Sequence, residues 1–157
     1  MALRPDATEE ARQIANLLAG DGEHDVAHAQ VGEFGQIARG NARRIVKPGQ
    51  FFNLIHVDDI AQAIDAALAR QISGIFNVAD DEPSPPGDPI AFAAQLLGRE
   101  PPPEIRFEAA APSMSPMALS FWQECRRVRN DKLKRELGVS LLYPTYREGL
   151  RALFETR

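Results

Sequence analysis

The chain has 157 residues, of which 44% are hydrophobic and 25% charged, a composition typical of one globular domain that buries roughly two thirds of its surface. Its formal net charge of -4 gives no general attraction to phosphate backbones or acidic lipids, so we expect no nucleic acid and no membrane as partners. A single cysteine, Cys125, cannot form an internal disulfide, and no apolar run approaches the roughly 18 residues of a membrane span. These totals predict a soluble, cytoplasmic protein.

The first expected elements are a helix and a short strand. Asp6 and Glu9 form a D-x-x-E capping pattern, and apolar residues then recur at helical spacing until Gly20. The segment HDVAHAQV, residues 24–31, alternates like a short strand, and GQIARGNARR, residues 35–44, predicts a short helix or turn.

The segment FFNLIHVDDIAQAIDAAL, residues 51–68, places two acids directly after a histidine. Its first seven residues are rich in β-branched and aromatic types and predict a strand or an extended lead-in. A helix over residues 59–70 follows, because apolar residues then recur at i, i+4, i+7 and i+8. Asp58 is expected to cap this helix, and Asp59 is favoured by the positive end of the helix dipole. The acid pair therefore indicates a helix start rather than a metal or proton-transfer site.

The next two segments predict a strand and a helix. GIFNVAD, residues 74–80, has the pattern of a strand that is covered on both faces inside a sheet. After a proline-rich stretch, Asp88 is expected to be the N-cap of a helix, with Pro89 at its first position and Gly98 at its end. Strands that alternate with helices in this way predict the α/β class with parallel β-α units.

The composition changes at REPPPEIRFEAA, residues 99–110, an extended, proline-stiffened stretch with strand-like residues around Arg106. We place a boundary here, which divides one compact unit into an α/β domain of residues 1–98 and a mostly helical subdomain of residues 99–157. The expected helices of this subdomain lie in SPMALSFWQECRR, in a stretch capped by Asn130 and ended by Gly138, and after a T-x-x-E capping box of Thr145 and Glu148.

Four motifs in order carry a family resemblance: IHVDDIAQAI, GIFNVADDEP, LKRELG and YPTYREGL. Over about residues 35–157 the sequence resembles the C-terminal half of extended short-chain dehydrogenase/reductases, the NAD-dependent epimerase/dehydratase family. The individual motifs are moderately specific. The resemblance implies a partial Rossmann-like, doubly wound parallel sheet with a mostly helical, substrate-side C-terminal subdomain. It also implies NAD or NADP as cofactor and a small-molecule substrate in the intact family.

The motifs that give this family its chemistry are absent from the sequence. There is no G-x-x-G-x-x-G loop to bind the dinucleotide pyrophosphate. The family's Y-x-x-x-K pair is also missing, because neither Tyr143 nor Tyr146 has a lysine four residues later. We therefore assign no catalytic and no coenzyme-binding residue. We expect the chain alone to be inactive and to bind neither NAD nor NADP, and we interpret it as a fragment or truncated product that lacks the dinucleotide-binding half.

Four residues are candidates for substrate binding. Asn53 and His56 lie near the end of an expected strand, where ligands of open α/β sheets gather, although a structural role is the plainer interpretation of the histidine. Arg126 and Arg127 begin the strongest local cluster of positive charge, which indicates either a solvated helix surface or an anion site. The neighbouring aromatic residues, Phe121 and Trp122, are expected in the core rather than against a ligand.

Two further functions compete with this interpretation. His24 and His28 imitate the zinc motif H-E-x-x-H, but in the expected strand they would lie about 13 Å apart, so we assign no metal site. The second competitor is a non-catalytic binding or dimerisation module. An exposed sheet edge would favour it, because unpaired strand edges tend to be covered by a partner, here a second copy in a homodimer.

Overall fold

The computed structural model describes residue 37 and residues 41–155. The predicted helix before Gly20, the predicted strand at 24–31 and the histidine pair lie outside these residues. In chain order the described elements are β1 (Arg44–Val46), α3 (Val57–Arg70), α4 (Gly87–Leu96), β2 (Glu104–Arg106), α5 (Phe107–Ala110), the 3-10 turn η2 (Ala111–Ser113), α6 (Pro116–Gln123), α7 (Asp131–Leu137) and α8 (Tyr146–Glu155). The predicted α/β class is confirmed.

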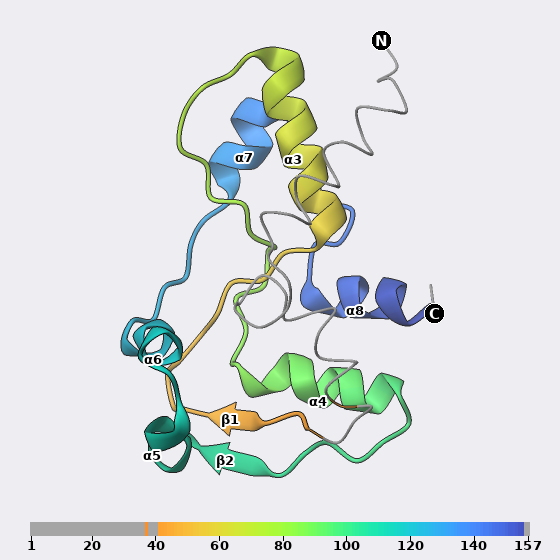
Figure 1. Ribbon diagram of the computed structural model, residues 1–157. Coiled ribbons are helices and arrows are strands. Elements are labelled where there is room, and N and C mark those ends of the chain that lie inside the picture. Colours follow the sequence, from red (N-terminus) through yellow and green to blue (C-terminus); the bar gives the residue numbers. More distant parts are fainter. Residues whose placement is uncertain (1–36, 38–40, 156–157) are drawn as a thin grey trace.

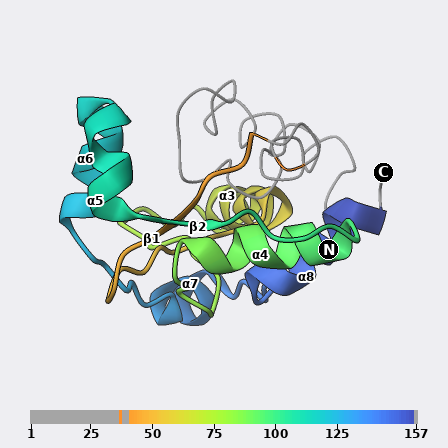
Figure 2. The ribbon, with the colours of Figure 1, turned by 90° about the horizontal axis from the view of Figure 1, so that it is seen from below.

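The sheet consists of β1 and β2, which pair in parallel with Ile45 opposite Ile105. In Figure 1 the layers follow one another from these strands through α4 to α8, while α3 and α7 lie together at the opposite end. Figure 2 shows α5 and α6 beyond one end of the two strands. The β1–β2 pairing crosses the expected boundary between residues 1–98 and 99–157, and that division stays a prediction.

The start of α3 confirms that the acid pair marks a helix start and corrects the identity of its cap. The helix begins at Val57, and the N-cap is His56, whose Nδ1 accepts a hydrogen bond from the Asp58 amide at 3.2 Å. The prediction of Asp58 as the cap is wrong, because this residue is already helical while His56 has the extended backbone of an N-cap (φ -79°, ψ 145°).

Residues 51–57, predicted as a strand or an extended lead-in, and residues 74–80, predicted as a strand inside a sheet, form no named strand. Residues 51–56 are extended and make one isolated antiparallel bridge, between Phe52 and Ser84. The prediction of a strand covered on both faces at residues 74–80 is wrong, since Ile75 is 88% exposed. Burial is confined to part of this run: Phe76 and Val78 contact the apolar cluster between α3 and α7, and Ala79 is buried at its end. A short apolar run does not reveal whether one face or both faces are covered.

The start of α4 differs from its prediction by two residues. The helix begins at Gly87, because Pro86, in the N-cap position, already has helical angles (φ -58°, ψ -28°). Asp88 therefore lies in the first turn and is not the N-cap. The end is as predicted, with Gly98 just beyond the helix at φ +64°.

The C-terminal helices begin and end where the sequence indicates. Asn130 occupies the N-cap position of α7, although its side chain forms no capping hydrogen bond and donates to the Ala79 carbonyl instead. Gly138 ends that helix in the left-handed region at φ +62°. The capping box before α8 is present: the Thr145 amide donates to the Glu148 carboxylate at 2.9 Å, and the Thr145 hydroxyl accepts from the Arg147 amide.

Two apolar clusters join these helices in pairs. Between α4 and α8 the buried residues are Leu54, Ala93, Ala94, Tyr146 and Leu150, together with Ile37. Between α3 and α7 they are Ala63, Leu133, Leu137 and Val139. Within the described residues no helix combines the length and the apolar character that crossing a bilayer requires.

Candidate functional site

A hollow of about 450 Å³ lies between the extended residues 51–53 and the chain around the end of α6, and we call it the Asn53 pocket. Its volume is in the range of small-molecule sites. The lining residues are Phe51, Phe52, Asn53, Ser120, Phe121, Gln123, Glu124 and Arg126. Three phenylalanine rings, two side-chain amides, a hydroxyl and a pair of opposite charges can surround a flat apolar molecule that carries a polar edge.

Two of the four predicted site residues meet in this pocket. The Asn53 side chain donates from Nδ2 to the Arg126 carbonyl at 2.7 Å, and its Oδ1 accepts from the Val128 amide at 3.0 Å. These bonds join parts of the chain that are 73 and 75 residues apart. Whether either residue binds a substrate stays a prediction.

The two arginines have different surroundings. Arg126 has a side chain that is 73% exposed and forms an ion pair with Glu124 at the edge of the pocket. Arg127 places its guanidinium carbon 3.5 Å from the centre of the Phe51 ring, a cation–π contact. The pocket edge therefore carries the charges of Glu124 and Arg126 and, at Phe51, an aromatic ring that contacts Arg127.

The remaining candidate, His56, has a structural role. It is buried, caps α3 and lies with its ring centre 4.0 Å from that of Tyr143. It does not line the Asn53 pocket. These contacts favour the structural interpretation of the histidine over contact with a substrate.

Sequence reasoning missed part of the aromatic lining. Trp122 is buried as expected and lies edge-on to Phe52, with ring centres 5.3 Å apart. The expectation of a core position for Phe121 is wrong, because this ring is 40% exposed and lines the pocket. The two residues are adjacent on α6 and so point in different directions, which is the signal that separates them.

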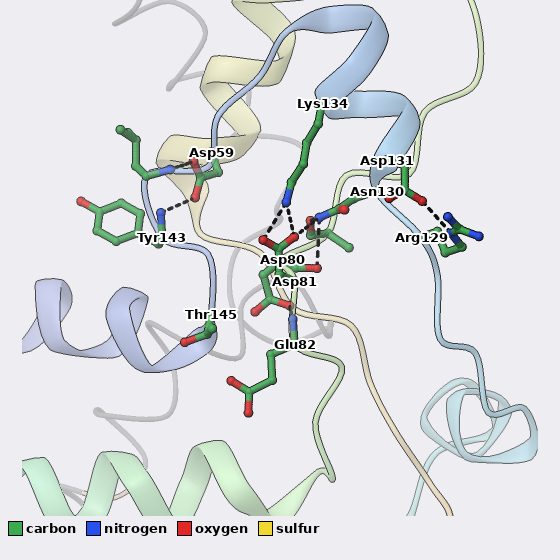
Figure 3. Close-up of polar contacts among 12 residues, drawn as sticks. Asp59, Asp80, Asp81, Glu82, Arg129, Asn130, Asp131, Lys134, Tyr143 and Thr145 are labelled. Atoms are coloured by element: carbon green, nitrogen blue, oxygen red, sulfur yellow. Dashed lines mark hydrogen bonds and ion pairs between the residues drawn. The ribbon is translucent and has the colours of Figure 1, made fainter.

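An acidic turn of Asp80, Asp81 and Glu82 lies beside the start of α7 and ties three segments together (Figure 3). Asp81 accepts from Lys134 Nζ at 2.5 Å and from Asn130 Nδ2 at 2.7 Å. Glu82 forms an ion pair with Arg147 of α8. The turn thereby connects α7 to α8.

Asp80 is the unusual member of this turn. It is 3% exposed, and its Oδ1 accepts from the Glu82 amide at 3.2 Å. Its Oδ2 is buried and has no hydrogen-bond partner among the described residues. Burial raises the pKa of Asp80 to about 7, and the negative charges of Glu82 and Asp81 act in the same direction.

The exposed acid Asp81 and the buried acid Asp59 differ from Asp80 in what sets their pKa. Burial alone would raise the pKa of Asp81, but the hydrogen bonds from Asn130 and Lys134, with the charge of Lys134, outweigh it and lower the pKa. Asp59 is fully buried and accepts from the amides of Leu142 and Tyr143 at 2.7 and 3.0 Å (Figure 3). Burial raises its pKa against the opposing effect of these two amides.

A second, open hollow of about 900 Å³ runs beside β1, β2 and the start of α4. Its charged lining has three basic residues, Arg44, Lys47 and Arg106, and three acidic ones, Asp88, Glu104 and Glu108. The balance gives it no net attraction for an ion of either sign. In the part of the chain that the structure describes, no group of three histidine, cysteine or acidic side chains is arranged to hold a metal ion.

Comparisons with known proteins agree with this fold. No protein-family model matches the chain. A 3-diazoavenalumate denitrifying reductase from a Streptomyces species is 32% identical over 99 residues, which are 62% of this chain and 32% of that protein. A solved structure of a functionally unknown conserved protein from Silicibacter pomeroyi is 54% identical, with a TM-score of 0.69 over 74% of this chain and 42% of the other.

A second solved structure shares the fold at lower identity. The human epimerase family protein SDR39U1, isoform 2, solved with NADPH, is 18% identical with a TM-score of 0.69, over 87% of this chain and 46% of that chain. The chain spans about a third of the curated relative that it matches and less than half of each solved chain. It is thus similar in sequence to a reductase and in fold to an epimerase-family protein.

Proposed function

We propose that this chain supplies the substrate side of an NAD(P)-dependent epimerase, dehydratase or reductase-like protein and is inactive by itself. The observation that carries the proposal is the Asn53 pocket, where two predicted site residues from distant parts of the sequence line one hollow of about 450 Å³. A small-molecule substrate would lie between the phenylalanine rings, with its polar edge toward Arg126.

The similar proteins support the choice of chemistry. The Streptomyces relative is a reductase, and the human protein was solved with NADPH, so a nicotinamide dinucleotide is the cofactor we propose for the intact protein. The sequence of this chain has no glycine-rich dinucleotide loop and no Y-x-x-x-K pair. Hydride and proton transfer are therefore assigned to residues outside this chain.

The test is a titration of the purified chain with NADPH and NADH, followed by the emission of Trp122, the single tryptophan. We expect no saturable change at micromolar coenzyme, and turnover of coenzyme only when a dinucleotide-binding half is supplied. Tight, saturable binding of either coenzyme by the chain alone would contradict the proposal that this chain supplies only the substrate side.

The alternative is a non-catalytic binding or dimerisation module, and exposed apolar side chains favour it. Leu68 at the end of α3 and Ile75 just after it are 67% and 88% exposed. A homodimer that covers them would show concentration-dependent sedimentation, whereas a monomer at all concentrations would remove the dimerisation module. The cytoplasmic location and the division at residues 98 and 99 stay predictions.

A further inference from the structure

The connection between α6 and α7, residues 124–130, belongs to no helix or strand, and we call it the 124–130 strap. Three amide side chains from other segments bind its backbone. Gln50 Nε2 donates to the Glu124 carbonyl at 2.9 Å, Asn53 bonds to the Arg126 carbonyl and the Val128 amide, and Asn77 Nδ2 donates to the Arg129 carbonyl at 3.1 Å. At the end of the strap the side chain of Asn130 itself donates to the Ala79 carbonyl at 2.9 Å.

Among these amides, Asn53 both donates to the strap backbone and accepts from it. Its amide group donates to residue 126 and accepts from residue 128, as the backbone of a neighbouring β-strand would. Asn53 therefore fixes both the position of the strap and which of its residues lie opposite Asn53. The two bonded groups, the Arg126 carbonyl and the Val128 amide, flank Arg127. The side chain of Asn53 therefore determines the backbone position from which the side chains of Arg126 and Arg127 extend.

The position of the strap decides the shape of the pocket edge. Glu124 and Arg126 are strap residues that line the pocket, and Arg127 stacks on Phe51, another lining residue. The charged side chains are exposed and long, so their own contacts do little to immobilise the backbone. The backbone is instead restrained by the side-chain amide of Asn53, which is itself a lining residue of the pocket.

We propose that Asn53 is a positioning residue, which holds the strap so that Arg126 and Arg127 stand at the edge of the Asn53 pocket. This inference rests on the proposed function of the pocket, and it changes the role predicted for Asn53 from substrate contact to support of the residues that make the contact. The polar atoms of Asn53 are directed to the strap backbone rather than to the hollow.

Three variants test the role. Asn53→Leu keeps the size of the side chain and removes both bonds. Asn53→Asp keeps the acceptor for the Val128 amide, loses the donor and places a carboxylate against the Arg126 carbonyl. The matched control is Asn77→Leu, which frees the same strap at Arg129, and Asn77 does not line the pocket. Circular dichroism checks that each variant is folded.

The first readout is limited trypsin digestion of the full chain, mapped by mass spectrometry, since the strap carries exposed arginines at 126, 127 and 129. Cleavage of a folded protein requires local opening of the backbone. We expect Asn53→Leu to be cut after Arg126 and Arg127 at least about tenfold faster than the unchanged chain, with Asn53→Asp in between. Asn77→Leu should be cut faster only after Arg129. An unchanged map for Asn53→Leu would overturn the inference.

The second readout is binding of 2-naphthoate, a flat aromatic anion, followed by the emission of Trp122 beside the pocket residue Phe52. We expect about tenfold weaker binding by Asn53→Leu, which corresponds to about 1.4 kcal/mol, and unchanged binding by Asn77→Leu. Equal binding by Asn53→Leu would overturn the positioning role and leave the pocket standing. No binding by the unchanged chain would overturn the pocket itself, while the trypsin map would still decide whether Asn53 holds the strap.

Discussion

The α3–α7 helix pair and the 124–130 strap are neighbours along the chain, yet different interactions hold them. The helix pair buries Ala63, Leu133 and Leu137 against each other, and apolar burial of this kind is non-directional and spread over many contacts. The strap exposes most of its side chains and is held by a few directional hydrogen bonds from amides such as Asn53. The stability of the fold therefore lies in the helix pairs, and the shape of the pocket edge depends on single side chains.

The largest effect is expected in the helix pair. Leu133 is fully buried between α3 and α7, so Leu133→Ala removes apolar contacts and leaves a cavity. We expect it to lower the free energy of unfolding by about 2–5 kcal/mol, measured by urea denaturation. The control is Leu68→Ala, an exposed residue of α3, with an expected change within about 0.5 kcal/mol. Equal effects of the two substitutions would mean that this helix pair does not hold the fold.

An intermediate, pH-dependent effect is expected at the acidic turn. Its residue Asp80 is as buried as the apolar residues of the helix pair, but its side chain can ionise. The pKa of Asp80 is raised to about 7, so the folded state favours its protonated form. The stability from this group is fully present below its unfolded pKa, near 3.8, and is lost as the pH rises through about 7. Asp80→Asn should thus become more stable relative to the unchanged chain as the pH rises from 4 to 8, measured by thermal unfolding.

The neighbouring acid provides the opposite control. The pKa of Asp81 is lowered, so its stabilising contribution is present above its unfolded pKa, near 3.8, and is lost as the pH falls through the lower folded value. Asp81→Asn should therefore destabilise the chain at neutral pH and less so in acid. The same pH dependence in both variants would show that the surroundings of the two carboxyls do not differ as the structure indicates.

The smallest effect is expected at the end of the strap. Arg129 and Asp131 form an exposed ion pair at 2.6 Å, and such pairs contribute little because water and salt screen them. Arg129→Gln should change the free energy of unfolding by less than about 0.5 kcal/mol in urea denaturation at low salt. A loss above about 1 kcal/mol would mean that charges, rather than amides, fix the strap.

The sequence predicted those parts of the fold that local rules determine. Helix α8 shows it well, because a T-x-x-E box specifies its start and is present. Of the apolar residues at helical spacing that specify its buried face, Tyr146, Leu150 and Leu153 pack as expected, whereas Phe154 is 39% exposed. The cap of α3 was missed by two residues, since a histidine is an unusual N-cap and Asp58 is a common type at that position. Composition and spacing describe an element better than its ends.

The candidate site was predictable only in part. Asn53 and Arg126 were singled out separately, but their hydrogen bond joins positions 73 residues apart, and no periodic pattern records such a contact. Gln50 and Asn77 hold the same strap and gave no signal, because single amides in extended segments look like ordinary surface residues. Of the two-stranded sheet, the sequence indicated β2, through the strand-like residues around Arg106, but not its partner β1. Each strand has three residues, and the two pair across two intervening helices.

The fully buried carboxylate of Asp59 also limits how the chain can change in length. It accepts the amides of Leu142 and Tyr143, which lie in a connection without helix or strand between α7 and α8. Surface connections usually tolerate insertions and deletions. Here one residue added or removed between Gly138 and Leu142 would move both amides away from the carboxylate and leave it buried without them. The length of this connection is therefore restrained by a buried contact, although it contains no helix or strand.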